Sequence, residues 1–374
     1  MRAVIARKGK LVVDEMATPE PGPGEVLVRT LACGICGSDL HAGQHPEIAA
    51  ETARKSGGFF RADPRRDLVL GHEFCAEVVD YGPNTERRLK PGTRVCSEPV
   101  IAIGEGLEPV GFSNAAPGGY GQYMRLLEGL LVPVPNGLST EHAALTEPVT
   151  VGVHAVSRAG IERNHAAVVV GCGPVGLAVI AALKLRGVGP VIAVDYSPAR
   201  RDLAVRMGAD EVVDPVSRSP YASFRELAVA GAEDAATRPS WLTGPLLRPQ
   251  VIFECVGVRG VLQQVLAGAE PGARVVVVGV CMEPDTIEPI YAINKDIDLL
   301  FAFGHSPAEF AATLGHIAEG AIPVEPLVTG IVGLEGVAGA FAELARPDRH
   351  AKILIDPWRT DDPETIRAPR SRGE

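Results

Sequence analysis

The 374-residue chain lacks three features that would assign its class at once: clustered cysteines, an excess of positive charge and long uninterrupted apolar runs. Its seven cysteines are scattered, and only Cys33 and Cys36 lie close together, which argues against a disulfide framework and for a reducing compartment. The net charge of -10 argues against nucleic acid or an anionic membrane surface as the main partner, because both are themselves negative. We therefore expect a cytoplasmic globular protein that binds neither nucleic acid nor membrane.

No membrane-directed segment is expected either. The first residues contain no long apolar region, so no secretory signal is predicted. One stretch, Ala166 to Leu185, is about long enough to span a bilayer. It begins with β-branched residues and is interrupted by Gly171, Gly173 and Gly176, so a buried strand, a glycine turn and a helix explain it better than a membrane span.

The chain is too long for one ordinary core and predicts two domains. The part before about Glu147 is rich in Gly and Pro, with short Val-rich runs at 25–28 and 77–79 that indicate antiparallel strands. From His165 onward, strands alternate with helix-length segments, which is typical of a parallel sheet wrapped by helices. Strands are predicted there at 167–170, 191–195, 251–254, 274–280 and 297–301.

The predicted α/β architecture has four parts. Residues 1–148 form a mainly antiparallel β domain, and residues 149–304 form a doubly wound parallel-sheet domain. Residues 305–357, with a helix at 307–319 and a strand at 352–355, return to the first domain. Residues 358–374 are polar and charged, which predicts a flexible tail.

A glycine motif in the second domain predicts a dinucleotide site. Gly171-Cys172-Gly173-Pro174-Val175-Gly176 follows a β-branched run and opens an apolar helix. Glycines at these positions permit a tight turn, close approach of a pyrophosphate and close helix packing, with the anion at the helix N-terminus. Asp195 lies 19 positions after Gly176, at the end of the next predicted strand, where a carboxylate binds ribose hydroxyls. A glycine turn without a ligand is the less favoured alternative.

Asp195 also bears on which dinucleotide binds. Its charge would repel the extra phosphate of NADP and accept hydrogen bonds from the ribose of NAD, so NAD is predicted. Arg200 and Arg201 follow closely and offer an alternative, because either could take a 2′-phosphate. We expect Arg200 to cover the adenine face instead.

Two short motifs near the N-terminus predict a metal site. Cys36-Gly37-Ser38-Asp39-Leu40-His41 and Gly71-His72-Glu73 together supply a thiolate, an imidazole and a carboxylate, the ligand types of catalytic zinc. Cys36 or His72 alone could be a core residue, but the presence of both complete motifs in one chain makes a purely structural role improbable. The isolated His154 and His316 are assigned no role. Five other cysteines are interpreted as small buried hydrophobes: Cys33, Cys75, Cys172, Cys255 and Cys281.

With both motifs in place, the chain resembles the zinc-dependent branch of the medium-chain dehydrogenase/reductase superfamily, from Met1 to about Pro357. The segment 147–154 is similar to sorbitol, butanediol and related polyol or secondary-alcohol dehydrogenases, which carry Glu-Pro where other alcohol dehydrogenases carry a zinc-binding cysteine. The resemblance implies a GroES-like catalytic domain, an NAD-binding Rossmann domain and assembly into homodimers or homotetramers.

The resemblance also implies roles for individual residues. It makes Cys36 and His72 zinc ligands, with Glu147 at the third position and Glu73 as a ligand in some members and not in others. Asp39 would accept the ring N–H of His72. Ser38 and His41 would carry the alcohol proton to solvent. The dinucleotide would contact Gly171, Gly173, Pro174, Val175, Gly176, Asp195, Arg200 and Val256.

The implied function is reversible hydride transfer between an alcohol and NAD. Zinc lowers the pKa of a bound water from 15.7 to roughly 7 in favourable sites, and we expect a bound alcohol to be acidified on a similar scale. Secondary alcohols, diols and polyols all remain open as substrates, since neither residues 42–70 nor His305 matches a known specificity pattern. The alternatives are a zinc-independent NADPH quinone or enoyl reductase of the same superfamily, or a dinucleotide-binding protein without enzymatic activity.

One departure from the family pattern concerns a second zinc. Many zinc-dependent relatives carry a structural zinc on a lobe with four closely spaced cysteines. The segment from Cys96 to Gln122 contains only Cys96, so a tetrahedral thiolate site cannot form there. We therefore expect one zinc ion per chain and a reshaped loop in place of the lobe.

Overall fold

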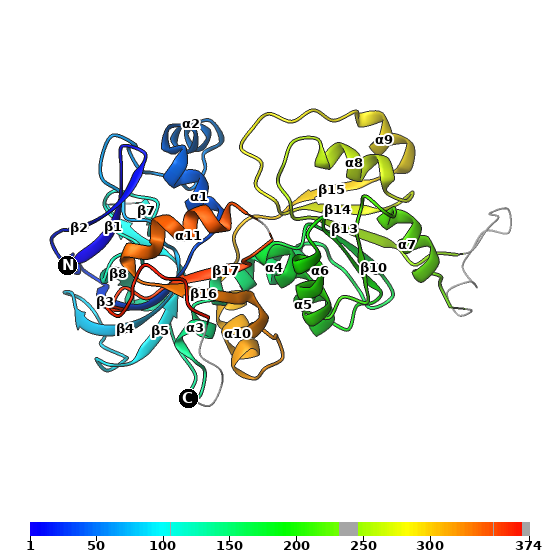
Figure 1. Cartoon of the computed structure of the whole chain (residues 1–374). Coiled ribbons are helices and arrows are strands. Elements are labelled where there is room, and N and C mark those ends of the chain that lie inside the picture. Colours follow the sequence, from blue (N-terminus) through cyan, green and yellow to red (C-terminus); the bar gives the residue numbers. More distant parts are fainter. Residues whose placement is uncertain (105, 232–245, 347, 369–374) are drawn as a thin grey trace. The chain divides into compact units, whose positions relative to one another are not determined.

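The structure is a computed structural model that describes residues 1–104, 106–231, 246–346 and 348–368. The chain forms two compact units, which Figure 1 shows by element label. Unit 1 consists of Met1–Pro148 together with Ser306–Glu374, and unit 2 consists of Val149–His305. None of the helices within the described ranges is long and apolar enough to cross a membrane.

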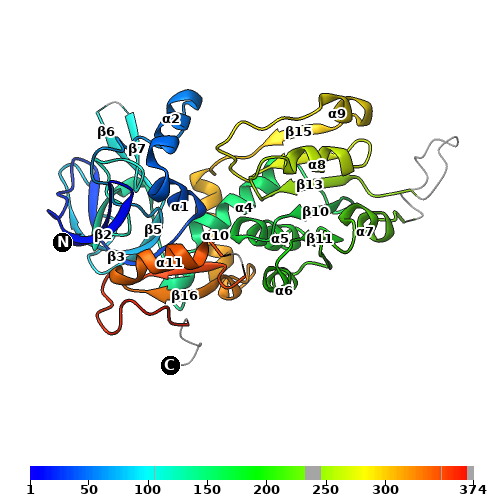
Figure 2. The same cartoon turned by 45° about the horizontal axis from the view of Figure 1, so that its top comes forward.

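Unit 2 is built on a six-stranded parallel sheet with the strand order β12-β11-β10-β13-β14-β15 (Figure 2). Its central strand consists only of alanine and valine, and Ala166 to Val169 are completely buried on both faces. Such all-apolar strands form where helices cover both faces of a parallel sheet. All five predicted strands are present, which confirms the α/β interpretation of this region. The elements are α4 (Thr146–Arg158, which begins in unit 1), β10 (Ala166–Val170), α5 (Pro174–Leu185), β11 (Val191–Val194), α6 (Pro198–Arg206), β12 (Glu211–Val213), α7 (Pro220–Leu227), β13 (Gln250–Glu254), α8 (Val261–Gly268), β14 (Arg274–Val277), α9 (Pro289–Lys295) and β15 (Asp298–Phe301).

Unit 1 is built on a seven-stranded, mainly antiparallel sheet with the order β16-β17-β3-β4-β5-β9, in which β8 also pairs with β3. Its elements are β1 (Arg2–Arg7), β2 (Lys10–Glu15), β3 (Glu25–Gly34), α1 (Gly37–Gln44), α2 (Pro46–Ser56), β4 (Glu73–Tyr81), β5 (Arg94–Ser97), β6 (Val100–Ile103), β7 (Gly106–Pro109), β8 (Tyr123–Leu127), η1 (Glu128–Leu130), β9 (Leu131–Pro133), α3 (Thr140–Ala143), α10 (Pro307–Ala318), η3 (Glu325–Leu327), β16 (Val328–Val332), η4 (Leu334–Gly336), α11 (Val337–Leu344) and β17 (Lys352–Ile355).

The C-terminal segment completes this sheet. Strand β17, drawn in red in Figure 1, pairs antiparallel with β3 through Leu354 opposite Gly34. Its residues Ile353 and Ile355 are fully buried in the same core as Val26 and Val28 of β3. The chain therefore needs its last strand to close the core that its first strands begin.

Residues 358–368 form specific hydrogen bonds with the rest of unit 1, whereas the sequence predicts a flexible tail there. The indole N–H of Trp358 donates to the Thr30 carbonyl at 2.7 Å. The backbones of Arg367 and Ile331 form two hydrogen bonds, of 3.0 and 2.8 Å, along the free edge of β16. The polar composition of the segment did not indicate these contacts, because they depend on one aromatic side chain and on backbone groups. Residues 369–374 lie outside the described part of the chain.

Two further sequence interpretations concern cysteine. Cys33, Cys75 and Cys172 are buried as expected, but Cys281 is exposed, so the prediction of a buried side chain was wrong there. It lies in the segment that connects β14 to α9. The segment after Cys96 forms the β6–β7 hairpin, and the buried thiol of Cys96 donates to the Ala143 carbonyl at 3.2 Å.

Candidate active site

Strand pairing in unit 1 brings the two N-terminal motifs together. Strand β3 ends at Gly34, two residues before Cys36, which is the N-cap of α1. Strand β4 begins at Glu73, and Glu73 lies opposite Gly34 in the β3–β4 register. Residues far apart in the sequence therefore meet where one strand ends and its neighbour begins.

The meeting point holds three candidate metal ligands. One ligand atom each of Cys36, His72 and Glu73 lies within 4.8 Å of the others. In the described ranges this is the one group of three or more such side chains, and it does not include Glu147. His72 and Glu73 are buried and Cys36 is half-buried. A thiolate and an imidazole at this spacing could hold zinc with one side open to a small molecule.

A buried carboxylate links two of these residues. Asp39 Oδ2 accepts the backbone N–H of Cys36 at 3.0 Å, and Asp39 Oδ1 lies 3.3 Å from His72 Nδ1. Burial lowers the pKa of His72, but the charges of Asp39 and Cys36 outweigh that effect, and its pKa lies well above the usual value. Asp39 thus lies behind His72, where the sequence analysis expects it.

Sequence reasoning missed a second partner of Asp39. The hydroxyl of Tyr120 donates to Asp39 Oδ2 at 3.0 Å, and both side chains are completely buried. Burial, together with the charge of Asp39, raises the pKa of Tyr120 well above 10, so the hydroxyl remains a donor. The two residues are 81 positions apart, and no local motif connects them.

Lys352 was missed as well, although it touches a candidate ligand. Its ammonium group donates to both carboxylate oxygens of Glu73 at 2.7 Å and to the Ile35 carbonyl at 3.0 Å. Burial raises the pKa of Glu73, and the positive charge of Lys352 only partly offsets this. Burial lowers the pKa of Lys352, but the charge of Glu73 outweighs it and the net shift is upward. From the sequence, Lys352 is simply the first residue of a hydrophobic strand.

Of the remaining predicted residues of unit 1, Glu147 lies in the first turn of α4, and Ser38 and His41 lie on α1. Ser38 and His41 are three residues apart on α1, so their side chains lie on one face of the helix. Ser38 is half-buried and His41 is exposed. The ring of Phe112, another residue that sequence analysis missed, packs on the His72 imidazole with 4.8 Å between centroids.

In unit 2, the glycine motif forms a tight turn at the start of a closely packed helix. Gly171 has φ +92°, and a Cβ there would lie 2.7 Å from Val256 Cγ2. A Cβ on Gly176 would lie 1.9 Å from the Gly171 carbonyl, so α5 can pack this closely only with glycine. Around Gly173, the N-cap of α5, a Cβ would meet no atom within 4 Å. The helix N-terminus that starts at Pro174 is therefore open to an anion.

Asp195, directly after β11, is held by the backbone at the same edge of the sheet. Its Oδ2 accepts the N–H of Cys172 and its Oδ1 accepts the N–H of Ser197, both at 2.8 Å. Arg200 Nη1 lies 3.9 Å from Oδ2. Arg201 Nη1 instead donates to the carbonyls of Asp195 and Tyr196 at 2.8 Å. The predicted carboxylate, Arg200 and the glycine turn therefore lie together.

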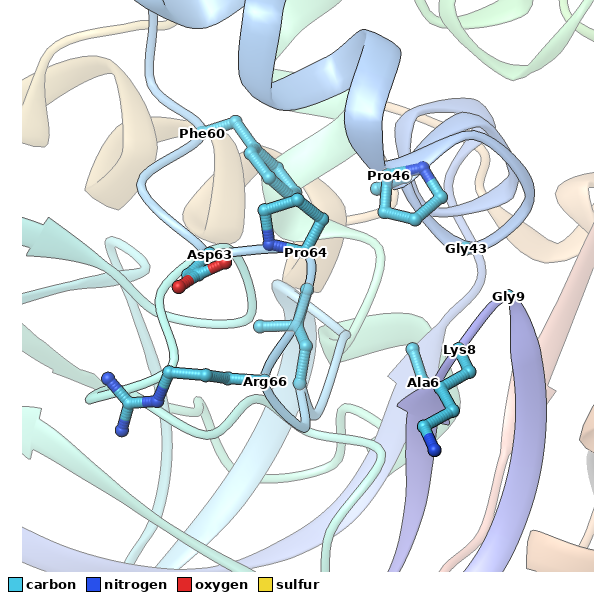
Figure 3. Close-up of a pocket in the computed structure, with 11 residues that line it drawn as sticks. Ala6, Lys8, Gly9, Gly43, Pro46, Phe60, Asp63, Pro64 and Arg66 are labelled. Carbon is cyan, nitrogen blue, oxygen red and sulfur yellow. The ribbon is translucent and has the colours of Figure 1, made fainter.

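A pocket elsewhere in unit 1 is too small to be a substrate site. Figure 3 shows Phe60 and Pro64 on one side of it and Ala6 and Gly43 on the other. Its volume is about 10 Å³, which holds about one water molecule. The Cys36–His72–Glu73 cluster and the glycine turn with Asp195 are therefore the better candidates for functional sites.

Comparison with known proteins identifies the family. The alcohol dehydrogenase GroES-like domain matches residues 22–136, and the zinc-binding dehydrogenase domain matches residues 174–319. Sorbitol dehydrogenase of Bos taurus is 31% identical over 364 residues, which cover 94% of each chain. The (R,R)-butanediol dehydrogenase of Bacillus subtilis is 31% identical over 354 residues, covering 92% of this chain and 96% of that protein.

Solved structures agree with this assignment. The 2R,3R-butanediol dehydrogenase from Bacillus subtilis superposes with a TM-score of 0.77 at 28% identity, covering 95% of this chain and 99% of that one. A zinc-binding dehydrogenase from Sinorhizobium meliloti bound to NADP superposes with a TM-score of 0.76 at 27% identity, with the same coverage. The chain therefore belongs to the zinc-dependent branch of the medium-chain dehydrogenase/reductase superfamily, with the sorbitol and butanediol dehydrogenases, and is an oxidoreductase that uses zinc and a nicotinamide dinucleotide.

Proposed function

We propose that this enzyme reversibly oxidises secondary alcohols, diols or polyols with NAD, using one zinc ion held in unit 1. The cluster of Cys36, His72 and Glu73 within 4.8 Å is the observation that carries the proposal. Sorbitol and butanediol, the substrates in the names of the relatives, support a polyol or diol. Unit 2 would act as the dinucleotide-binding domain and unit 1 as the catalytic domain.

The donor set fits zinc. A thiolate and an imidazole select zinc over hard cations such as magnesium. His72 Nδ1 and Asp39 Oδ1 are buried without an aligned hydrogen bond although they lie 3.3 Å apart, so a proton on Nδ1 facing Oδ1 would satisfy both atoms. That tautomer leaves Nε2 of His72 free to bind the metal.

The third protein ligand is a choice between two glutamates. Both oxygens of Glu73 already accept hydrogen bonds from Lys352. Glu147 lies near enough that its negative charge contributes to the raised pKa of Glu73. We therefore propose Glu147 as the third ligand, with Glu73 and Lys352 as a buried pair behind Cys36 and His72.

The chain's own residues would then transfer the proton and orient the zinc-binding histidine. Zinc, when bound, supplies a Lewis acid that makes an alcohol hydroxyl more acidic. Ser38 and His41 would take the proton along α1 from a half-buried to an exposed position. Asp39 would hold His72 in one tautomer. The dinucleotide, bound at the glycine turn, supplies the hydride acceptor.

A substrate panel tests the proposal directly. Reduction of NAD and NADP should be measured with sorbitol, 2,3-butanediol and simple secondary alcohols, before and after zinc removal by a chelator. We expect activity with at least one of these alcohols, its loss on chelation, and one zinc ion per chain by elemental analysis. Activity that survives chelation would favour a zinc-independent reductase, and two tightly held zinc ions would contradict the single site.

The proposed preference for NAD rests on Asp195. Its carboxylate would accept hydrogen bonds from the ribose, and Arg201 is already bound to two carbonyls and lies 3.5 Å from Asp214. Asp195→Ala removes an acceptor for charge-assisted hydrogen bonds, so kcat/KM for NAD should fall about 10- to 100-fold while that for NADP rises. Asp202→Ala on the exposed side of α6 is the matched control. A wild-type preference for NADP, the dinucleotide bound to the Sinorhizobium relative, would contradict the proposal.

We further propose that the enzyme is a homodimer or homotetramer assembled through β15. This strand lies at the edge of the unit 2 sheet, and among the described residues no second strand pairs with its outer backbone groups. Ile293, Phe301 and Phe303 expose 71%, 63% and 75% of their surface near it. A second copy pairing its own β15 would satisfy the edge and cover these side chains. Sedimentation equilibrium of the purified chain should give a dimer or tetramer, and a stable monomer would contradict this.

We also propose a cytoplasmic location. All seven cysteines are free thiols. A reducing compartment keeps them so. Cell fractionation of the native source should recover the enzyme with cytosolic markers, and recovery with a secreted fraction would contradict the proposal.

A further inference from the structure

The hydroxyl of Tyr120 is a group for which core packing alone gives no reason. The Tyr120 side chain is completely buried and its ring packs edge-on against Phe341, with 6.2 Å between centroids. A phenylalanine would fill that space equally well. A buried hydroxyl costs free energy unless it has a partner, and the partner here is Asp39.

The backbone around Tyr120 is fixed against the residues that precede His72. The N–H of Tyr120 donates to the Leu70 carbonyl at 3.0 Å, and the N–H of Gly119 donates to the Gly71 carbonyl at 2.8 Å. A Cβ on Gly71 would lie 2.5 Å from the Tyr120 ring. The ring and the approach to His72 therefore cannot move independently.

Asp39 receives three groups that together fix its orientation. Oδ2 accepts the Tyr120 hydroxyl and the Cys36 N–H, each at 3.0 Å. With Oδ2 held by these two donors, the other oxygen, Oδ1, faces His72 Nδ1 at 3.3 Å. Without the hydroxyl, one backbone N–H alone would hold Oδ2, and rotation about χ2 of Asp39 would become easier.

We propose that Tyr120 is a positioning residue for the zinc site, acting through Asp39 on His72. The inference rests on the proposed zinc-dependent function. Its hydroxyl holds Asp39 so that the carboxylate accepts the ring N–H of His72, which fixes the tautomer and direction of the other ring nitrogen. Loss of groups that orient a metal-binding histidine lowers metal affinity about 10- to 100-fold. Tyr120 acts one residue further from the metal, so we expect the lower end of this range.

The test compares Tyr120→Phe with Tyr123→Phe, a matched control. Tyr123 is half-buried in the same unit, and its ring packs on Trp358 instead of on the Asp39 side. Zinc affinity should be measured by competition with a chromogenic chelator, with the absorption spectrum of the cobalt-substituted protein as a second readout. Tyr120→Phe should weaken zinc binding about 10-fold and shift the cobalt bands. Tyr123→Phe should change neither, and neither variant should alter dinucleotide binding.

Asp39→Asn and the double variant locate the effect. If Tyr120 acts through Asp39, Asp39→Asn should weaken zinc binding at least as much, and adding Tyr120→Phe to it should weaken binding no further. Equal zinc affinity of the wild type and Tyr120→Phe, or additive losses in the double variant, would overturn the inference while leaving the proposed function intact. A wild-type protein that binds no zinc would overturn both. Should Asp39→Asn fail to fold, the affinity and cobalt spectrum of Tyr120→Phe still decide the question, because that variant keeps the buried ring.

Discussion

Replacing Cys36 with alanine should lower kcat/KM by at least about 1000-fold, or about 4 kcal/mol of transition-state stabilisation. Cys36 offers the thiolate of the cluster, and its side chain is half-buried, so it faces the open side of the site. Without it, only His72 and the proposed ligand Glu147 would remain to hold zinc, because Glu73 is bound to Lys352. Zinc content of the purified variant should fall from one ion per chain to a small fraction of that.

The same variant should leave dinucleotide binding nearly intact, which makes the experiment specific. The glycine turn and Asp195 are held by contacts within unit 2, such as the bond from Cys172 N–H to Asp195. Cys281→Ala, which removes an exposed thiol in unit 2, is the control and should change neither zinc content nor turnover. Loss of NAD binding in Cys36→Ala would mean that the domain roles are wrong, and full activity would mean that the zinc ligands are wrong.

The parts of the site that sequence analysis predicted lie in short motifs, and the family resemblance joined those motifs into one site. The glycine turn is recognisable because Gly171 and Gly176 each occupy a position that a side chain cannot, and both lie within one strand-turn-helix segment. Cys36 and Asp39 are likewise joined by a bond across three residues. Such short-range constraints act directly on residue type, so they can be read from the order of residues.

The parts that were missed depend on contacts between distant segments. Lys352 meets Glu73 across 279 positions, and Tyr120 meets Asp39 across 81. Lys352 looks like the first residue of a hydrophobic strand, and Tyr120 lies in a glycine-rich segment. Neither position has a local motif that indicates which polar group its side chain meets. Trp358 was missed for the same reason, because its partner Thr30 lies at the other end of the chain. The fold class was predictable from periodicity, whereas the contacts of Lys352 and Tyr120 were not.

Lys352→Met should be strongly destabilising, by about 3 to 5 kcal/mol in the free energy of unfolding. Lys352 is 2% exposed, and it gives both oxygens of the fully buried Glu73 a partner at 2.7 Å. Methionine fills a similar volume but leaves the carboxylate charge unpaired in the core, beside the charge of Glu147. The loss of stability should therefore come from the unpaired charge of Glu73. Chemical denaturation at constant pH measures the free energy of unfolding.

A double variant separates this cause from simple loss of packing. If the unpaired charge is responsible, Lys352→Met combined with Glu73→Gln should recover at least about 2 kcal/mol of the loss, because an ion pair removed as a whole leaves no buried charge. The exposed pair Lys55–Glu51 offers the control, and Lys55→Met should change stability by less than about 1 kcal/mol. Equal losses in the single and double Lys352 variants would instead assign the effect to the lysine's contact with the Ile35 carbonyl and to its packing. Because Ile35 directly precedes Cys36, that result would still connect the last strand of the chain to the first ligand of the metal site.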